Sequence, residues 1–476
     1  MKGITIAKAV SVCKGEYFGD ESFLGREISS VTIDSRTCEK DCLFCALKGE
    51  NSDGHDYIQK ALDMGALCCL SEHPPAGNSS VIAVSSVAAA IQALGAYYRS
   101  LFNIPVIGIT GSVGKTTTKE MLAAVLSQRF NVHKTRGNFN NELGVPLTLF
   151  GLDETHEAAV IEMGISQFGE MTRLTDMVRP DIAVITTIGQ AHLEVLGSRQ
   201  GVLKAKSEIL KGMSDSGRLF INGDDDVLKT IECRQQVIRY GLGDDCGVRA
   251  HNLEVLGVSG TACDVSLGDE DIHIETGAFG SHMVYAALAA CAVAHTLGLT
   301  GSEIVRGVKN YADVGSRSDV IETGFCRIID GSYNANPTST ASALQSLAGI
   351  KGRCVAILGD MKELGEDSYK LHIQTGSKAA GSSIELLIAC GDDARGIYEG
   401  AEEMGSKRLY FKTKQALINE LPALIQEGDT VLVKASRGMK FEDIADKLKE
   451  LKPSSFSEKS LFAQGVHVSV RPQQKD

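Results

Sequence analysis

The stretch Pro105–Glu120, PVIGITGSVGKTTTKE, restricts what this chain can fold into more than any other. Its apolar start predicts a buried strand, a glycine turn follows, and the apolar spacing of residues 121–126 predicts a helix. Such a strand, glycine loop and Lys-Thr helix start form a cradle for phosphate, because backbone N–H groups and the positive helix end face the anion. Lys115 is then expected to reach the terminal phosphates, and the Thr116 hydroxyl to ligate the magnesium that accompanies a nucleotide.

The glycine spacing of this loop departs from the usual phosphate-loop pattern, which would place the first glycine at Ile109. The loop is therefore interpreted as a shortened variant that runs from Gly111 to Thr116. An ordinary strand-to-helix turn with a solvated lysine is the alternative. The strand before the loop and the helix after it favour nucleotide binding.

The length and charge of the chain limit its class. A chain of 476 residues is too long for one ordinary domain and predicts about two to four, each with its own core. Lys and Arg total 48 against 60 Asp and Glu, and the net charge of −12 disfavours nucleic-acid binding through phosphate contacts. Two stretches without Asp, Glu, Lys or Arg, Asn78–Tyr98 and Phe279–Ser302, are Ala-rich and contain polar residues, so we predict buried helices and no membrane insertion.

The cysteines indicate a reducing environment. Several of the 13 lie inside apolar runs, and Lys8 interrupts the N-terminal segment that an export signal would need, so we expect reduced thiols and a cytoplasmic protein. Cys38, Cys42 and Cys45 have the spacing of an iron–sulfur motif. Cys42 and Cys45 bracket an apolar pair of a predicted strand and should point to opposite faces, which disfavours a cluster.

Alternating strand and helix patterns predict an α/β fold with three domains and a polar tail. A smaller α/β domain is expected over residues 1–102, followed by a central domain with a mostly parallel sheet of the P-loop type over 103–313. A polar break near Asp313–Arg317 precedes a doubly wound, Rossmann-like domain over 314–452, and residues 453–476 form the tail. Ligands are expected in the clefts between domains, where strand carboxyl ends meet.

Charged residues follow further strands of the central domain. Glu162 ends the strand VIE, where an acidic residue beside a phosphate loop is the usual second anchor for magnesium, and a solvated carboxylate is the alternative. His192 lies just past the strand DIAVITTIG and is a candidate ligand for a second magnesium ion. Lys204 and Lys206 fall on different faces of a predicted helix, and their spacing alone favours solvated lysines.

Two segments are rich in amide side chains. NFNNELGVP, residues 138–146, fits either a capped turn at a helix start or hydrogen bonds to sugar and phosphate oxygens. SYNANP, residues 332–337, precedes a predicted helix, and a helix cap alone would account for it. Asp330, at the end of the strand before it, is placed to accept a hydrogen bond from a ribose hydroxyl.

In combination and order, these motifs resemble the Mur ligase family, whose members form amide bonds with ATP in peptidoglycan synthesis. The resembling segments span nearly everything from about residue 30 to 445 and include VTIDSRTCEKDCLFCALKGENSDGHDYI, TGSVGKTTTKE, NFNNELGVP, IGQAHLEVLGS with AKSEI, DGSYNANP, LGDMKELG and VKASRGM. The resemblance implies an ATP-dependent ligase that adds D-alanyl-D-alanine to a UDP-N-acetylmuramoyl-tripeptide through an acyl phosphate. It further implies two magnesium ions, and we expect a monomer.

Two other functions are compatible with parts of these motifs. A related ligase that adds a single amino acid, or glutamate to folate, has the same general build. A GTPase-like switch is disfavoured, because its guanine-binding N-K-x-D motif needs an Asn followed by Lys and this chain has none.

The resemblance also implies roles for individual residues. Lys115, Glu162, His192 and Lys206 would be catalytic, with Lys206 carbamylated, and Thr116, Glu162 and His192 would ligate magnesium. The expected ATP contacts are Thr110, Gly111, Ser112, Val113, Gly114, Lys115, Thr116, Thr117, Arg317, Asp330, Asn334 and Asn336. The expected contacts to the UDP precursor and the dipeptide are Ser35, Arg36, Asn138, Asn141, Lys434, Ser436 and Arg437.

One helix departs from the family pattern. Members usually have G-x-H-N-x-x-N before an Ala-rich stretch, whereas this chain has GSHMVYA. Its two Asn positions are Met283 and Ala286, while His282 is retained. Those amides commonly help to hold the adenine, which leaves the adenine contacts of this chain open.

Overall fold

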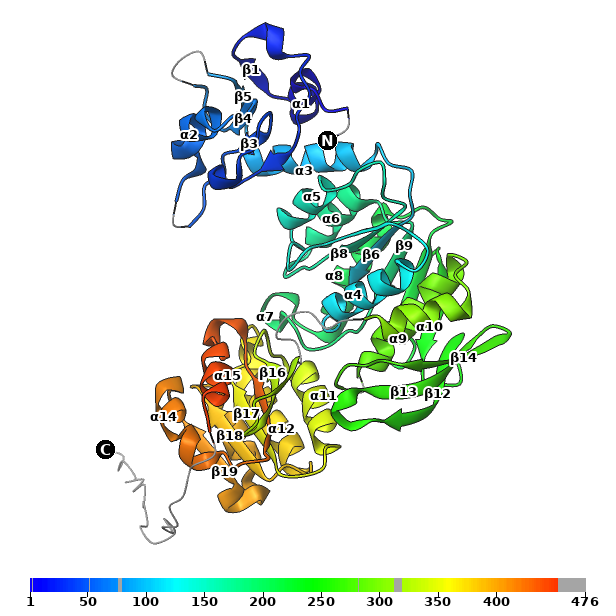
Figure 1. The fold of residues 1–476 in the computed structure, drawn as a ribbon, viewed down its shortest axis with the longest axis vertical. Helices are drawn as coiled ribbons and strands as arrows, with labels where there is room; N and C mark the ends of the chain where they lie inside the picture. Colours follow the sequence, from blue (N-terminus) through cyan, green and yellow to red (C-terminus); the bar gives the residue numbers. More distant parts are fainter. Residues whose placement is uncertain (2, 51, 76–78, 281, 312–318, 453–476) are drawn as a thin grey trace.

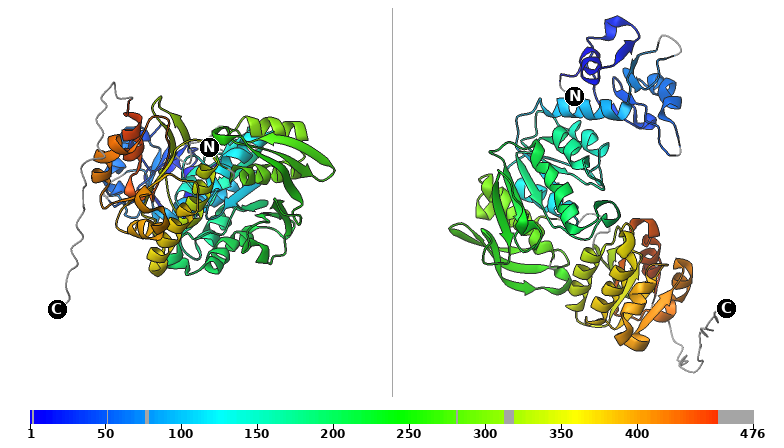
Figure 2. Two further views of the ribbon diagram at one scale, coloured as in Figure 1. Left: turned by 90° about the horizontal axis from the view of Figure 1, so that it is seen from below. Right: turned by 180° about the vertical axis from the view of Figure 1, so that it is seen from behind.

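The computed structural model describes residues 1, 3–50, 52–75, 79–280, 282–311 and 319–452. Within these residues three sheets follow one another along the chain, and Figure 1 shows them as three bodies around an open curve. The view from behind shows the same order (Figure 2). The predicted α/β fold with three sheet-containing parts is confirmed. The predicted break at Asp313–Arg317, the boundary at 313, Arg317 itself and the tail at 453–476 lie outside the described residues.

The first sheet is small and covered by short helices. Its elements are α1 (Ile6–Cys13), β1 (Glu16–Phe18), β2 (Val31–Thr32), β3 (Leu43–Cys45), α2 (Ile58–Asp63), β4 (Cys68–Ser71), β5 (Val81–Ala83) and α3 (Val87–Arg99). The strand order is β1-β5-β4-β3-β2, and only β1 runs antiparallel to its neighbour.

The cysteines of this first sheet separate as predicted. Side chains alternate between the two faces of a strand. Cys45 packs in one apolar cluster, whereas Cys38 and Cys42 pack in another. Among the described residues, no group of three His, Cys, Asp or Glu side chains is arranged to hold a metal ion.

The second sheet carries the glycine loop on an inner strand. Its elements are β6 (Val106–Thr110), α4 (Lys115–Leu126), β7 (Val132–Lys134), α5 (Gly144–Leu149), β8 (Ala158–Glu162), α6 (Glu170–Val178), β9 (Ile182–Ile185), α7 (Leu193–Leu196), α8 (Arg199–Ser207), β10 (Arg218–Asn222), β11 (Gln236–Gly241), β12 (Val248–Val255), β13 (Thr261–Leu267), β14 (Glu270–Glu275), α9 (His282–Thr296) and α10 (Gly301–Lys309). The strand order is β14-β13-β12-β11-β10-β9-β6-β8-β7, parallel from β7 to β12 and antiparallel beyond.

The position of β6 brings the ends of several strands together. β6 pairs in parallel with both β8 and β9, so the carboxyl ends of these three strands lie along one edge. Ile107 and Ile109 of β6 pack toward α4 and α9, while Val106 packs into the core on the opposite face. Because both faces are apolar and covered, polar side chains gather only where the strands end.

The Ala-rich stretch after residue 279 forms α9, which lies in the apolar core between α4 and the β10–β13 strands. This confirms the predicted buried helix. Over the described parts of the chain, no helix combines the length and the apolar character needed to cross a membrane.

The third sheet is doubly wound. Its elements are β15 (Asp319–Glu322), β16 (Arg327–Gly331), α11 (Pro337–Ala348), β17 (Cys354–Gly359), α12 (Ser368–Ala380), β18 (Leu386–Cys390), α13 (Arg395–Gly400), β19 (Arg408–Phe411), α14 (Lys414–Leu424), β20 (Thr430–Lys434) and α15 (Glu442–Lys449). The order is β15-β16-β20-β17-β18-β19, and all pairs except β15 with β16 are parallel. α11, α12 and α13 cover one face and α14 and α15 the other.

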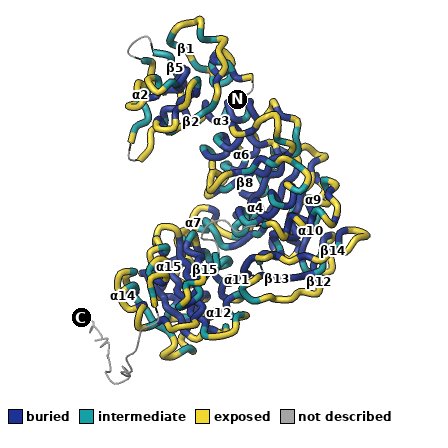
Figure 3. The backbone as a smooth tube through the Cα atoms, viewed as in Figure 1, coloured by how far each residue is buried: buried dark blue, intermediate teal, exposed yellow. Residues whose placement is uncertain are grey.

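The sheets join differently at their two seams. Figure 3 shows buried backbone running through α3 from the first sheet into the second, where one apolar core includes residues of both. The third sheet has two cores, and one of them also includes Phe279 of the central domain. Its contact with the central domain includes a small cluster in which Leu193 packs with Ala335, Met361, Leu364 and Leu371.

Candidate active site

The glycine loop is held tightly between β6 and α4. Gly111 and Gly114 have φ of 149° and 85°, and a Cβ at Gly111 would lie 1.9 Å from the Oγ1 of Thr186. Glycine is therefore required at 111. Thr186 Oγ1 donates to the Val113 carbonyl at 2.5 Å, so the loop is anchored to the segment that follows β9. α4 begins at Lys115 directly after Gly114, which directs its N-terminal N–H groups toward the loop.

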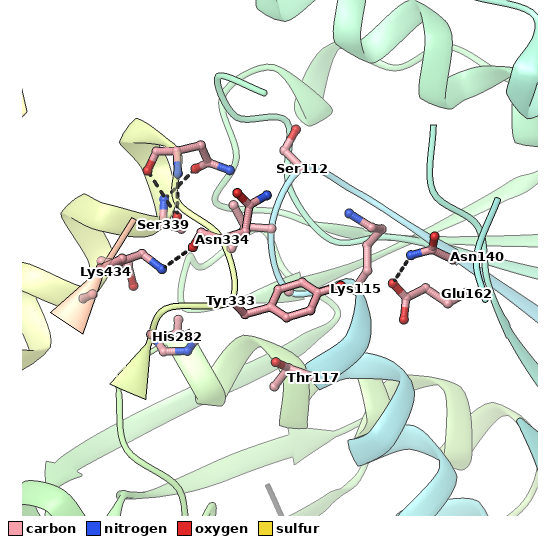
Figure 4. A pocket seen from close by; sticks show the side chains of 16 residues that line it. Ser112, Lys115, Thr117, Asn140, Glu162, His282, Tyr333, Asn334, Ser339 and Lys434 are labelled. Carbon is pink, nitrogen blue, oxygen red and sulfur yellow. Dashed lines mark hydrogen bonds between the residues drawn. The ribbon is translucent and has the colours of Figure 1, made fainter. Parts of the chain in front are cut away.

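Lys115 and the loop form one wall of a cavity of about 250 Å³. The Nζ of Lys115 donates to the Gly111 carbonyl at 2.9 Å. The opposite wall comes from the third domain, and Figure 4 shows Tyr333, Asn334 and Lys434 across the cavity from the loop. The lining residues are Ser112, Val113, Gly114, Lys115, Thr117, Asn140, Glu162, His282, Gly331, Tyr333, Asn334, Asn336, Ser339, Ser342, Ala343 and Lys434.

Glu162 ends β8 beside the loop, and its alternative as a solvated carboxylate is wrong because it is 1% exposed. Its Oε2 accepts a hydrogen bond from Thr116 Oγ1 at 2.8 Å, and its Oε1 accepts one from Asn140 Nδ2 at 2.8 Å. Two predicted magnesium ligands thus meet, and both offer the hard oxygen atoms that magnesium prefers.

Lys119 is a buried charge that the sequence interpretation missed. Its side chain is 0% exposed, and its Nζ lies 2.9 Å from Glu120 Oε1 and 3.7 Å from Glu162 Oε2. It also donates to the Thr135 carbonyl at 2.8 Å. The sequence spacing indicates this position. Lys119 is three residues after Thr116, and residues three apart lie on the same face of a helix.

The structure selects one amide from NFNN, and it is not a predicted one. Asn140 reaches the cavity and Glu162. Asn141 instead accepts hydrogen bonds from the N–H groups of Leu143 and Gly144, as expected of a helix cap, and Asn138 is exposed. Neither Asn138 nor Asn141 lines the cavity at the loop, and the substrate contacts expected of them stay a prediction.

Lys204 and Lys206 lie on different faces of α8, as predicted, but the expectation of two solvated lysines is wrong. Lys206 is 1% exposed, whereas Lys204 is exposed with its Nζ 5.9 Å from the centroid of the Phe168 ring. Burial and, next, the charge of Lys115 hold the pKa of Lys206 well below its usual value. Spacing alone could not show which face of α8 meets the core.

His192 is separated from the predicted magnesium ligands. It precedes α7 with φ of 54°, and its Nδ1 lies 2.6 Å from Oε2 of Glu363 in the third domain. The hydrogen bond from His192 lowers the pKa of Glu363. His192 does not line the cavity that holds Lys115 and Glu162.

The amides of the third domain serve both as caps and as cavity lining. Asn336 caps α11, where its Oδ1 accepts from Ser339 N at 2.8 Å, and it also lines the cavity. The Asn334 carbonyl accepts from Lys434 Nζ at 2.9 Å. Asn334, Asn336 and Lys434 are thus placed at the cavity as predicted.

Other predicted residues of the third domain lie outside the cavity lining. Asp330 is buried and accepts from Ser332 N at 3.0 Å, so the predicted ribose contact is not supported by its placement. Ser436 is buried and its Oγ accepts from Lys362 N at 2.8 Å. The Arg437 guanidinium lies 5.7 Å from the centroid of Tyr333, a cavity residue.

Ser35 and Arg36 lie in the first domain, in a short 3-10 helix (Ser35–Thr37) that follows β2. Ser35 is buried, and the exposed Arg36 forms a salt bridge with Asp34 at 2.7 Å. Neither residue lines the cavity at the loop. Thr110 is buried at the end of β6, and its Oγ1 has no hydrogen-bond partner among the described residues.

A second cavity of about 240 Å³ adjoins the first. Asn222, Tyr240, Tyr285 and Ala286 of β10, β11 and α9 line it, together with Asp224 and Asp225. Five residues line both cavities: Val113, Gly114, Thr117, His282 and Ser342.

Three family models match this chain along most of its length. They are the Mur ligase family catalytic domain over residues 27–106, the Mur ligase middle domain over 109–294, and the Mur ligase glutamate ligase domain over 316–437. The UDP-N-acetylmuramoyl-tripeptide–D-alanyl-D-alanine ligase of Bacillus subtilis (strain 168) is 36% identical over 441 residues, which cover 89% of this chain and 93% of that protein. The chain belongs to the Mur ligase family.

Two solved structures resemble this Mur ligase. MurF from Acinetobacter baumannii superposes with a TM-score of 0.85 at 31% identity, covering 94% of this chain and 99% of the other. MurF ligase from Thermotoga maritima in complex with ADP has a TM-score of 0.80 at 27% identity, covering 88% of this chain and 97% of the other.

The departure of this Mur ligase in α9 affects its second cavity. Met283 is 2% exposed and packs in the apolar core, so it offers nothing to a ligand. Ala286 lines the second cavity with a methyl group. Any hydrogen bonds to a base there must come from other residues.

Proposed function

We propose that this Mur ligase uses ATP to join D-alanyl-D-alanine to a UDP-N-acetylmuramoyl-tripeptide. The relatives of B. subtilis and A. baumannii support this assignment, since they carry the names of enzymes of that reaction. The observation that carries it is the cavity at the glycine loop. There the Lys115 wall faces a third-domain wall that contains Asn334 and Lys434, so one site can take both a nucleotide phosphate and a reacting acid.

The chemistry follows from the need to activate a carboxylate. An oxygen of the tripeptide carboxylate attacks the γ-phosphorus of ATP, a P–O bond forms, and ADP leaves with the electrons of the broken P–O bond. The dipeptide amine then attacks the acyl carbon, and phosphate departs from the tetrahedral intermediate with loss of a proton from nitrogen. Lys115 stabilises the negative charge of the transferring phosphoryl group, and the two walls hold the reactants in contact.

Magnesium fits the oxygen atoms beside the loop. Thr116 and Glu162 would hold one ion, because their hydroxyl and carboxylate oxygens already lie within 2.8 Å of each other. When bound, the ion would neutralise charge on the phosphates. A second ion at His192 stays a prediction, and the contact of Nδ1 with Glu363 leaves Nε2 as the ring nitrogen that could ligate it.

Carbamylation of Lys206 is supported by its surroundings. Burial holds the pKa of this amine well below its usual value, which favours the uncharged form, and the uncharged amine is the form that attacks carbon dioxide. The carbamate that forms with release of a proton would be negative, and Lys115 is near enough to influence it.

The remaining substrate contacts are proposed by domain. The UDP part of the precursor would bind the first domain near Ser35 and Arg36, and the dipeptide would bind near Lys434, Ser436 and Arg437. A cytoplasmic monomer stays the expectation for this enzyme.

Two measurements test the proposed function. Lys115→Ala should abolish ADP formation while circular dichroism stays that of the wild type, and substantial substrate-dependent turnover in this variant would refute the role of Lys115. In the wild type, phosphate release should require D-alanyl-D-alanine. A flat response to the dipeptide with a strong response to a single amino acid would instead assign the chain to a related ligase.

A further inference from the structure

His282 stands where the two cavities of the active site meet. It is the first residue of α9 and one of the five residues that line both cavities. Figure 4 shows its ring at the bottom of the first cavity, below Lys434 and Tyr333. Among the shared residues it has the longest side chain that can donate a hydrogen bond.

The two ring nitrogens of His282 have different surroundings. Nδ1 is buried and has no hydrogen-bond partner among the described residues. It packs against Gly280, where a Cβ would lie 2.5 Å from Nδ1, and Gly280 has φ of 109°. A buried N–H without an acceptor is costly, so the tautomer with its hydrogen on Nε2 is favoured. Nε2 is then the donor that His282 offers to the cavities.

The charge state of His282 restricts which group of a ligand can accept its hydrogen bond. Burial and, next, the Lys434 ammonium lower the pKa of His282 to about 4, so the ring is neutral at physiological pH. A neutral N–H donor suits a neutral acceptor such as a hydroxyl, whereas phosphate oxygens suit the charged Lys115 and Lys434 that line the same cavity.

We propose that His282 donates a hydrogen bond from Nε2 to a ribose hydroxyl of ATP. This inference rests on the proposed function, since it assumes that the phosphates of ATP bind at Lys115. The loop wall of the first cavity then holds the phosphates, and the second cavity, lined by Tyr240, Tyr285 and Ala286, takes the base. The ribose connects these two parts of ATP, so it must cross the shared wall at His282. His282 thereby takes the role that the sequence suggested for Asp330, which lines neither cavity.

A nucleotide series on purified full-length protein tests this proposal. Calorimetric titration with ADP, 2′-deoxy-ADP and 3′-deoxy-ADP measures binding without requiring the ligase reaction. In the wild type, one deoxy analogue should bind about tenfold more weakly than ADP, as expected for one lost hydrogen bond. His282→Phe keeps a ring against Gly280 and removes the donor. This variant should bind ADP about tenfold more weakly than the wild type does, and it should bind that deoxy analogue with the affinity of the wild type.

Two further variants separate a contact from a packing effect. His282→Gln can still donate through its amide and should recover part of the preference for ADP. His295→Phe is a matched control, because His295 is exposed near the other end of α9, and it should bind all three nucleotides like the wild type.

Each outcome bears on the proposal. If His282→Phe weakens the binding of ADP and of both deoxy analogues equally, His282 acts through packing or through a phosphate contact, and the proposal is overturned. Unchanged binding of ADP by this variant would also overturn it. A wild type that binds ADP with the ribose preference but releases no phosphate with D-alanyl-D-alanine would refute the proposed function and leave the His282 contact standing.

Discussion

Two acidic side chains of the active-site region make contacts of opposite kinds. Glu162 is almost fully buried, and its partners Thr116, Asn140 and Lys119 all belong to the central domain. Glu363 belongs to the third domain, is largely exposed, and pairs with His192 of the central domain. The difference indicates that the proposed magnesium position at Glu162 would be assembled within one domain, whereas the one proposed at His192 would depend on how two domains meet.

The largest expected effect concerns the buried carboxylate. Glu162→Gln removes the charge that would hold magnesium, and ADP formation at saturating magnesium should fall by about 100-fold or more. Glu120→Gln is the matched control, because Glu120 also pairs with Lys119 but lines no part of the cavity. In Glu120→Gln, ADP formation should fall by less than about tenfold. Equal losses in both variants would contradict a special role for Glu162.

The second effect follows from the buried amine of Lys206, whose folded-state pKa is well below the usual 10.5. Between these two pKa values the unfolded chain binds more protons, so the free energy of unfolding should rise with pH by up to about 1.4 kcal/mol per pH unit. Lys206→Met should remove this contribution. Urea unfolding of both proteins in carbon-dioxide-free buffers from neutral pH to about pH 9 measures it. Identical slopes would mean that Lys206 is solvated.

A smaller effect is expected from the amide that orients Glu162. Asn140→Ala removes a hydrogen bond to a carboxylate, and kcat/KM for ATP should fall by about tenfold with a rise in the magnesium concentration needed for half-maximal rate. Asn131→Ala provides a control, since Asn131 donates to Thr155 away from the cavity. A normal magnesium response in Asn140→Ala would show that Glu162 is oriented without it.

The smallest effect should come from the pair between domains. Glu363→Gln removes one charge from an exposed contact, and such pairs contribute at most about 1 kcal/mol. The melting temperature should therefore change by less than about 4 °C. A much larger shift would show that this single contact maintains the arrangement of the central and third domains.

Local patterns were sufficient for the parts of the site that depend on one strand and its turn. The apolar run before Gly111 predicted β6, and the acidic end of VIE predicted Glu162 beside the loop. Both predictions depend on the short-range periodicity of strands and on the rule that parallel strands end at one edge.

Sequence patterns did not determine the features that depend on long-range packing. Nothing in NFNN distinguishes Asn140 from its neighbours, because the turn after residue 137 decides which amide faces Glu162. The burial of Lys206 depends on which face of α8 meets the core. The contact of His192 with Glu363 joins residues 171 positions apart on different sheets, beyond any local pattern.

The apolar core that passes through α3 also limits how this chain can be divided. α3 packs against α1 of the first domain and against α5 and α6 of the central domain, so a cut after residue 102 would strip one face of the helix of its cover. The first two sheets should therefore unfold as one cooperative unit, and the third, whose cores consist almost entirely of its own residues, as another. A chimaera with a related enzyme should exchange the first two sheets together, because within the described residues they share one core, whereas the third sheet shares little of its cores with them.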